Sequence, residues 1–416
     1  MDPVTESQAP GTASPPLTFL CLASYEKGHR ALETLKRAGC RVLLLTSLSL
    51  KDTAQWPRDS LDNIFYLPDQ EHAWDLQEML RGVCHLARTE RIDRILPLDD
   101  FDLEKAAFLR EHLRLPGMGE SITRYFRDKL AMRIRARDRG VQVPDFTPTS
   151  NNAAIAAFLD RVPPPWVLKP RLMAGAIGIK KLLTRDEAWD CVSAAGNEQS
   201  FFVLEKFVPG HTYHVDSIWF RGKMSYSVAS SYGTPPLEVT TSGGIFTTRL
   251  LQAGGDEDVA LRSMNEQILR ALGLESGVSH TEFIRSHEDD TYYFLETSAR
   301  VGGAHISDLI EAATGINFWS EWAKVEVAEA VGCHYSPPEA RTDCGGLLIS
   351  LAKQERPDTS SFRDPELVWR LEKNHHVGFI VKSPRWERVE ELLQDYTRRV
   401  RTEYHASAPP RDKVRD

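Results

Sequence analysis

The feature that most constrains the fold is an alternation of short apolar segments with helix-like segments before residue 119. Four apolar stretches predict strands: LTFLCLA, CRVLLLTS, NIFYLPD and RIDRILPLDD. The segments between and after them repeat apolar residues at helical spacing. Such alternation predicts a parallel sheet with helices on its faces. The first strand–helix turn, ASYEKGH, has one glycine and lacks G-x-G-x-x-G spacing, so we expect no standard dinucleotide site there.

The pattern changes after about Gly119, where hairpin-like segments replace the alternation. The basic stretch 122–140 predicts one helix, and TYHVDSIWF with GKMSYSVASSYG predicts an antiparallel hairpin. The expected fold class is therefore α/β (α+β). We predict these units: a flexible tail (1–16), an N-terminal parallel α/β domain (17–118), a central domain (119–332) with a small lobe (about 122–203) and a large lobe (about 204–332), a C-terminal α+β unit (333–405) and a second tail (406–416).

Composition narrows the class of protein. The 416 residues carry a formal net charge of -8, which disfavours a nucleic-acid partner held by phosphate contacts. No apolar run approaches the roughly 20 residues of a membrane span, and the acidic N-terminus lacks the pattern of a signal peptide. The six cysteines form no C-x-x-C pair and predict free thiols. We expect a soluble, cytoplasmic protein with neither nucleic-acid nor membrane partners.

A phosphate-binding pattern follows one apolar strand. Lys169 ends the strand WVLKP, and the next loop contains Gly175 and Gly178. Glycines let backbone amides approach an anion, and a lysine beside them adds a point charge. Taken in isolation, Lys169 is better explained as a solvated strand end. Lys129, on the basic stretch, is likewise explained by a solvated helix face.

The segment VLEKFVPG is apolar except at Glu205 and Lys206. A strand that leaves its sheet after Glu205 would expose backbone donors and acceptors. Such an edge can hydrogen-bond an adenine beside apolar Phe207 and Val208. The alternative is a plain connecting segment.

Two carboxylates give the sharpest signal. Glu282 and Glu296 lie in two β-like segments joined by the short polar stretch RSHEDDT. Adjacent antiparallel strands would place both on one face, where they repel unless a cation lies between them. Mg²⁺, oxygen-ligated and shared with nucleotide phosphates, fits there. Arg300 argues against two merely solvated carboxylates, because a guanidinium suits a developing phosphoryl or carboxylate charge.

The polar segment Ser230–Arg249 predicts a long functional loop. We expect its Ser242 and Gly243, together with Arg300, to contact an amino-acid substrate. A simple surface excursion is the alternative.

Taken in order, Lys129, Lys169, the glycine loop, EKFV, Glu282 and E-x-S-x-R resemble the ATP-grasp superfamily over about residues 120–330. ARVGGAHI is similar to its carboxylate–amine ligases, in particular the L-amino-acid ligases. The resemblance implies an ATP-grasp fold whose N-terminal domain is 17–118 and whose closing unit contains HHVGFIVKS. It also implies a homodimer as a family-level expectation.

The resemblance further implies residue roles. Lys129 and Lys169 would contact ATP phosphates under a mobile loop containing Gly175 and Gly178. Adenine would be held by Glu205 and the backbone of Lys206 and Val208, with Phe207 adjacent, and His214 or Asp216 would lie near the ribose or the metal. Glu282 and Glu296 would ligate two Mg²⁺ ions, for which Mn²⁺ can substitute. Arg300 would stabilise an acyl phosphate, while Gly302 and Gly303 keep the backbone close to substrate.

Two positions depart from the family pattern. Ser298 stands where the family usually has asparagine, although its hydroxyl can still ligate magnesium. In RVGGAH, Ala304 replaces the glutamate base of biotin carboxylases, which argues against a carboxylase. His305 is expected either to contact substrate or simply to start a helix.

The predicted activity is an ATP-dependent ligase that forms C–N bonds. A carboxylate takes the γ-phosphoryl group to give an acyl phosphate and ADP, and an amine then displaces phosphate. Lys169 and Arg300 are the predicted catalytic residues, and an amino acid is the expected substrate. One alternative applies the same chemistry to a purine or carbamate intermediate. Another is a nucleotide-binding protein without catalysis.

Overall fold

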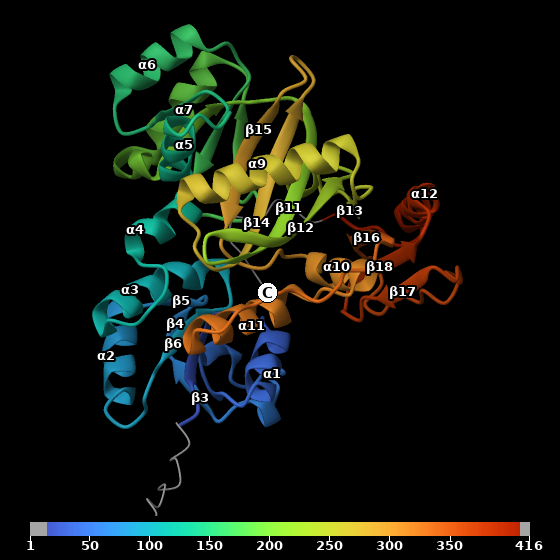
Figure 1. Ribbon diagram of the computed structural model, residues 1–416. Helices are drawn as coiled ribbons and strands as arrows, with labels where there is room; N and C mark the ends of the chain where they lie inside the picture. Colours follow the sequence, from blue (N-terminus) through green and yellow to red (C-terminus); the bar gives the residue numbers. More distant parts are fainter. Residues whose placement is uncertain (1–14, 408–416) are drawn as a thin grey trace, which may run out of the picture.

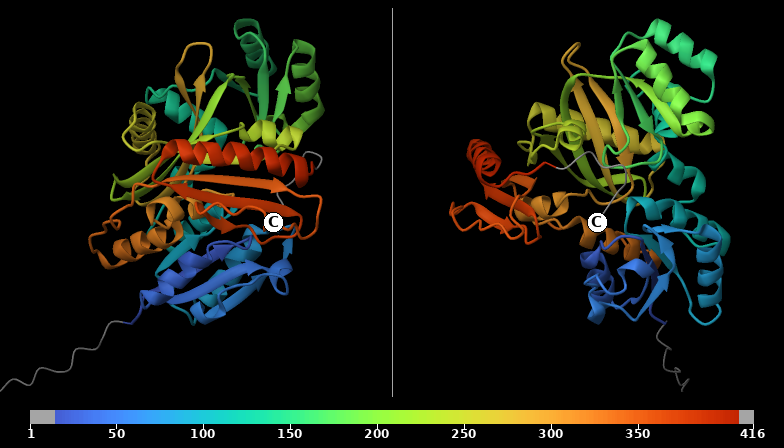
Figure 2. Two further views of the ribbon diagram at one scale, coloured as in Figure 1. Left: turned by 90° about the vertical axis from the view of Figure 1, so that its right-hand side faces the viewer. Right: turned by 180° about the vertical axis from the view of Figure 1, so that it is seen from behind.

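Residues 15–407 are described by a computed structural model, so most of both predicted tails lies outside the described part. The described strands form two four-stranded sheets, one eight-stranded sheet and a two-stranded ribbon. Figures 1 and 2 show the N-terminal part (blue) at one end of the molecule and the second sheet with its helices (green) at the other. The C-terminal strands (red) extend to the side.

The N-terminal part is the predicted parallel α/β unit. Its sheet has the order β3-β2-β1-β6, and every pairing in it is parallel. The elements are β1 (Thr18–Ala23), α1 (His29–Arg37), β2 (Arg41–Ser47), η1 (Leu48–Leu50), η2 (Arg58–Ser60), β3 (Asn63–Leu67), β4 (Asp69–Gln70), β5 (Ala73–Trp74), α2 (Leu76–Leu86), β6 (Arg94–Pro97), η3 (Asp100–Asp102) and α3 (Leu103–Leu113). The parallel sheet predicted from the alternation is confirmed.

The second sheet is antiparallel and has the order β7-β10-β8-β9. Its elements are β7 (Phe146–Pro148), α6 (Asn152–Arg161), β8 (Trp166–Pro170), β9 (Lys180–Leu182), α7 (Arg185–Ala195), η5 (Gly196–Phe201) and β10 (Phe202–Lys206). Helices α6 and α7 pack their apolar sides onto it in a separate hydrophobic cluster. We call this part, residues 146–206, the small lobe; it overlaps the predicted small lobe of about 122–203.

The single helix predicted over 122–140 is wrong. The stretch forms α4 (Glu120–Thr123), η4 (Arg124–Phe126) and α5 (Lys129–Asp138). The break comes at Asp128, whose carboxylate accepts hydrogen bonds from the amides of Leu130 and Ala131 and so caps a new helix. Lys129 therefore stands in the first turn of α5, and it is buried rather than solvated.

The eight-stranded sheet has the order β15-β14-β11-β12-β13-β16-β18-β17. Its elements and helices are β11 (Gly210–Phe220), β12 (Lys223–Tyr232), α8 (Pro236–Ser242), β13 (Phe246–Leu250), α9 (Asp256–Leu272), β14 (Gly277–Ser286), β15 (Tyr292–Ser298), α10 (Ile306–Thr314), α11 (Phe318–Val331), β16 (Cys344–Leu351), β17 (Leu367–Arg370), β18 (His376–Ser383) and α12 (Trp386–Glu403). The predicted hairpin of β11 with β12 is confirmed. The C-terminal strands continue this sheet instead of forming one of their own.

The two faces of β11 serve different cores because successive side chains of a strand point to opposite faces. Trp219, with Tyr213 and Val215, packs in a cluster with α5 and α9. Ile218 and Phe220 join a cluster that includes α10, α11 and residues of β1, β2 and α1. Helices α10 and α11 thus connect the large sheet to the N-terminal part.

The prediction that Ser230–Arg249 is one long loop is wrong. The segment begins inside β12, contains α8 and ends inside β13. Pro236 stands at the start of α8, where its missing N–H costs nothing, and Gly243 ends the helix in a left-handed conformation. The polar composition concealed a helix that lies over a cavity.

All six cysteines are free thiols, as predicted. Among residues 15–407, no helix combines the length and apolarity that a bilayer crossing requires.

Helix α9 offers a test of the packing. Leu269 is fully buried, whereas Val259 on the same helix is 55% exposed. Leu269→Ala should lower the free energy of unfolding by about 2–5 kcal/mol through lost burial and a residual cavity. Val259→Ala should change it by less than about 0.5 kcal/mol. Urea unfolding of both variants measures this, and equal effects would contradict the assigned core.

Candidate functional site

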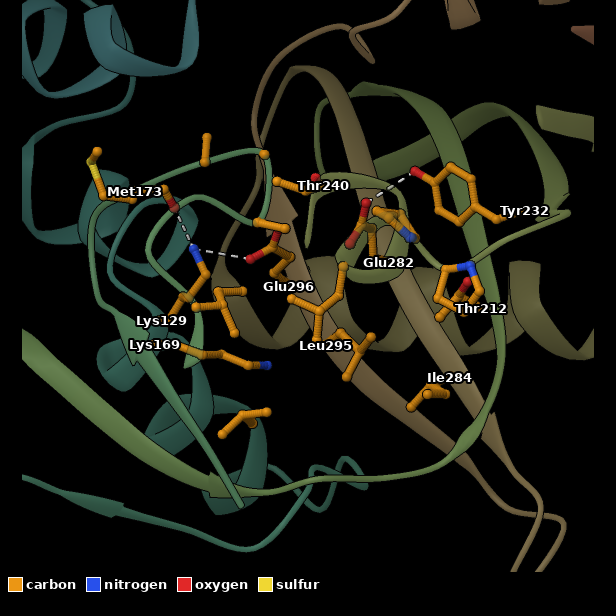
Figure 3. A pocket seen from close by; sticks show the side chains of 18 of the residues that line it. Lys129, Lys169, Met173, Thr212, Tyr232, Thr240, Glu282, Ile284, Leu295 and Glu296 are labelled. Carbon is orange, nitrogen blue, oxygen red and sulfur yellow. Dashed lines mark hydrogen bonds and ion pairs between the residues drawn. The ribbon is translucent and has the colours of Figure 1, made fainter. Parts of the chain in front are cut away.

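A cavity of about 930 Å³ lies between the small lobe and the large sheet. Its wall includes the glycine loop after β8, the exit of β10, helix α8 and the ends of β14 and β15. Figure 3 shows Lys129 and Lys169 on one side, with Glu296, Glu282 and Tyr232 across from them. The cavity therefore brings together most of the residues that sequence reasoning selected.

The carboxylates of Glu282 and Glu296 come from paired positions on β14 and β15. The predicted placement on one face of a hairpin is confirmed. Glu296 lies 3.0 Å from the ammonium of Lys129, and Glu282 accepts a hydrogen bond of 3.0 Å from the Tyr232 hydroxyl. Two oxygen donors on one rigid hairpin, facing a cavity, fit a hard divalent cation.

Lys129 connects the carboxylates to the glycine loop. Its Nζ donates to the carbonyl of Met173 at 2.5 Å while it pairs with Glu296 (Figure 3). In that loop Gly175 and Gly178 have φ near +70°, a region that favours glycine. A Cβ on Gly178 would also lie 2.9 Å from the Pro170 ring.

Glu205 is fully buried between two cations. Its carboxylate lies 3.0 Å from Nε of Arg133 and 2.8 Å from Nζ of Lys169. Burial would raise the pKa of Glu205, but Arg133 and Lys169 hold that pKa below its ordinary value. The carboxylate therefore orients Lys169, and its predicted contact with adenine stays a prediction.

Two backbone amides at the exit of β10 already have hydrogen-bond acceptors within the chain. The amide of Lys206 donates to Asp145 O at 2.8 Å, and that of Phe207 donates to Pro165 O at 3.0 Å. Neighbouring loops therefore accept hydrogen bonds from these two amides, and the predicted contact of adenine with the backbone of Lys206 and Val208 stays a prediction. Phe207 and Val208 still line the cavity, where the Lys181 ammonium lies 3.8 Å from the Phe207 ring centroid.

A second buried carboxylate, missed by sequence reasoning, comes from the N-terminal part. Asp100, in η3, accepts hydrogen bonds from Arg127 and from the Ser298 hydroxyl, and it lies 3.8 Å from Nε of Arg300. Burial would raise the pKa of Asp100, but Arg127 and Arg300 hold it below the usual range. Ser298 thus turns its hydroxyl hydrogen toward Asp100. The sequence LPLDDFD, acidic directly after a strand, was the available signal.

Behind Glu282 lies a buried group of histidines around Asp216. The two carboxylate oxygens of Asp216 lie 2.8 Å from Nδ1 of His214 and 2.9 Å from Nδ1 of His280. Both imidazoles are buried, and Asp216 and Glu282 raise the pKa of His280 to about 9 against the effect of burial. Burial lowers the pKa of His214. His280, which sequence reasoning missed, lines the cavity, whereas His214 and Asp216 lie behind it.

The remaining predicted substrate residues are divided. Gly303 lines the cavity, but Gly302 packs against Asp216 and His280 instead. His305 directly precedes α10, pairs with Asp308 at 2.7 Å and lies with its ring tilted against Trp369, while its predicted contact with substrate stays a prediction. Ser242 and Gly243 stand at the end of α8, and their contact with substrate stays a prediction.

The comparisons with known proteins agree with this geometry. No family model matches the chain. The arginine-specific L-amino acid ligase of Bacillus subtilis is 23% identical over 64% of this chain and 64% of its own length. The alanine–anticapsin ligase of Bacillus subtilis is 24% identical over 61% and 57%, so the chain spans less than two thirds of these relatives.

Solved structures match over nearly the whole chain. The L-amino acid ligase of Bacillus licheniformis superposes with a TM-score of 0.72 over 94% of this chain and 99% of its own, at 18% identity. The chain has the ATP-grasp fold. A biotin carboxylase domain of Hydrogenobacter thermophilus in complex with MgADP, at 14% identity, gives a TM-score of 0.68 over 92% and 90%. The fold predicted from the ordered motifs is confirmed.

The buried Glu205 network predicts a pH-dependent stability. A carboxyl whose folded pKa is depressed contributes stability above the unfolded value, near 4.5, and loses it as pH falls through the folded pKa. Glu205→Gln leaves the fully buried Arg133 and the partly buried Lys169 without their counter-charge and should cost about 3–5 kcal/mol at pH 7.

Denaturant unfolding at pH 7 and at pH values below 4.5 measures the effect, and the gap from the wild type should narrow on acidification. Glu266→Gln, which removes an exposed pair with Arg270 on α9, should cost less than about 1 kcal/mol throughout. A gap that is constant with pH would contradict the ionised state of Glu205.

Proposed function

We propose that this protein is an ATP-dependent carboxylate–amine ligase that forms an amide or peptide bond through an acyl phosphate. The single observation that carries the proposal is the facing pair of Glu282 and Glu296 beside Lys129 and Lys169 in one cavity. The ATP-grasp fold and the L-amino acid ligase relatives support it. Amino acids are the proposed substrates.

Divalent metal fits the donor set of the site. Glu282 and Glu296 would hold Mg²⁺, with Mn²⁺ as a substitute, and Ser298 can contribute its oxygen while it donates to Asp100. Bound metal supplies charge neutralisation for the phosphates. Two ions are the proposed number, by analogy with the family. Lys129 and the metal are alternative positive partners for Glu296.

We assign the following binding and catalytic roles to the residues of the cavity. Lys169, held by Glu205, and Lys129 would contact the phosphates beneath the loop of Gly175 and Gly178, with Lys206 to Val208 at the adenine end. Arg300, which donates to Val301 O at 2.8 Å and faces Asp100, would stabilise the charge on the acyl phosphate. A closed glycine loop and α8 would exclude the water that hydrolyses that intermediate. Catalysis is thus mainly positioning and electrostatics.

Two predictions outside the site stay open to test. The cytoplasmic location rests on the free thiols. The homodimer rests on the family resemblance and is testable by light scattering.

The function is tested by analysis of nucleotide products. With ATP, Mg²⁺ and pairs of L-amino acids, the wild type should release ADP and phosphate only when a suitable pair is present. Glu296→Gln should reduce this release by about a hundredfold or more, because it removes a carboxylate that would hold the metal ion against the phosphates.

Asp290→Asn is the matched control, since this exposed residue lies in the turn of the same hairpin at φ 58°, which asparagine accepts. It should keep the wild-type rate. Release of AMP and pyrophosphate would contradict the acyl-phosphate route. Tight ATP binding without turnover would favour the non-catalytic alternative.

A further inference from the structure

Strand register places a polar group directly behind Glu282. His214 pairs with Glu282 and Asp216 pairs with His280 across β11 and β14, so all four side chains share one face of the sheet. Thr248, on β13, closes the group at 2.8 Å from Nε2 of His214. Except for Glu282, these residues are buried.

The contacts of this group converge on one oxygen of Glu282. The Tyr232 hydroxyl lies 3.0 Å from Oε1 of Glu282, a hydrogen bond drawn as a dashed line in Figure 3. Nε2 of His280 lies 3.7 Å from the same oxygen. Nε2 of His280 also lies 3.4 Å from the Tyr232 hydroxyl. Because Tyr232 and His280 both contact Oε1 of Glu282, we assign Oε2 of this carboxylate to the cation.

Asp216 fixes the ring of His280. Each of its oxygens takes the Nδ1 of one imidazole, which orients both rings from behind. The nitrogens and carboxylate of His214, Asp216 and His280 lie within 4.8 Å of one another. Each Nδ1 is nevertheless engaged in a hydrogen bond to Asp216. We therefore assign the group to the positioning of Glu282 and not to a separate metal site.

The close approach of Gly302 is independent evidence that the backbone accommodates the Asp216–His280 pair. A Cβ at this position would lie 2.7 Å from Oδ1 of Asp216 and 3.0 Å from Nδ1 of His280. Both atoms belong to buried, hydrogen-bonded groups, so moving them away from an added Cβ would cost free energy. Only glycine allows the backbone after β15 to pass so close to the pair.

We propose that His280, oriented by Asp216, is a positioning residue that together with Tyr232 fixes the Glu282 carboxylate for metal ligation. This inference rests on the proposed role of Glu282 as a metal ligand. Removal of a residue that hydrogen-bonds a metal-ligating side chain commonly lowers metal affinity by about 10- to 100-fold. His280 acts through Glu282 and does not itself need to touch substrate.

The test measures Mn²⁺ binding in the presence of ADP by the loss of the free-Mn²⁺ electron paramagnetic resonance signal. His280→Asn keeps an amide near Nδ1 for Asp216 but removes the ring edge that faces Glu282, and it should weaken Mn²⁺ binding about tenfold or more. His280→Gln places an amide near Nε2 and should recover part of the affinity. Gly302→Ala should weaken binding in the same direction.

The matched control is His211→Asn, an exposed histidine on β11 whose ring packs against His287. It should bind Mn²⁺ like the wild type. ADP binding in EDTA, measured calorimetrically, should be unchanged in every variant, which separates loss of positioning from loss of the fold.

Wild-type Mn²⁺ affinity in a folded His280→Asn variant overturns the proposal. If that variant does not fold, His280→Gln and Tyr232→Phe decide: weakened Mn²⁺ binding in Tyr232→Phe supports the proposal, and unchanged binding in both overturns it. A wild type that binds Mn²⁺ with ADP but joins no amino acids would refute the ligase function alone. The two failures are therefore distinguishable.

Discussion

The structure depends on holding two carboxylates close together inside a cavity. Glu282 and Glu296 face each other across two strands, where their repulsion must be offset locally. Lys129 offsets it at Glu296, and Tyr232 and His280 do so at Glu282. The same cavity is the one that we propose for a metal ion and for the phosphates of a nucleotide.

Two further buried carboxylates, Glu205 and Asp100, are also held by positively charged partners, and these contacts connect distant parts of the chain. Glu205 joins α5 to β8 through Arg133 and Lys169. Asp100 joins the N-terminal part to the end of β15 through Ser298 and Arg300. Buried charges are costly without partners, so these ion pairs restrict how the three parts can be arranged. Ser298 stands where the family usually has asparagine. At this position Asp100, from the N-terminal part, supplies an additional carboxylate.

Sequence reasoning succeeded where a pattern is local. The parallel sheet, the β14–β15 hairpin and the ordered ATP-grasp motifs were all predictable, because strand–helix alternation and short turns are written in neighbouring residues. It failed where one residue changes the local outcome: Asp128 splits a basic helix, and Pro236 with Gly243 forms α8 in a segment that composition marks as loop. Asp100 and His280 were missed because their partners lie up to 198 and 64 residues away.

The sequence by itself determined the class of fold, the strands that carry the chemistry and the carboxylate and lysine residues that we propose for nucleotide and metal. These follow from periodicity and motif order, which are properties of short segments. Tertiary structure alone decided which atoms face each other: that Lys129 links Glu296 to the glycine loop, that Asp100 contacts Ser298, and that Gly302 lies against Asp216 and His280. The reason is physical, since register and the packing of the sheet against distant helices fix distances of a few ångströms that no local pattern encodes.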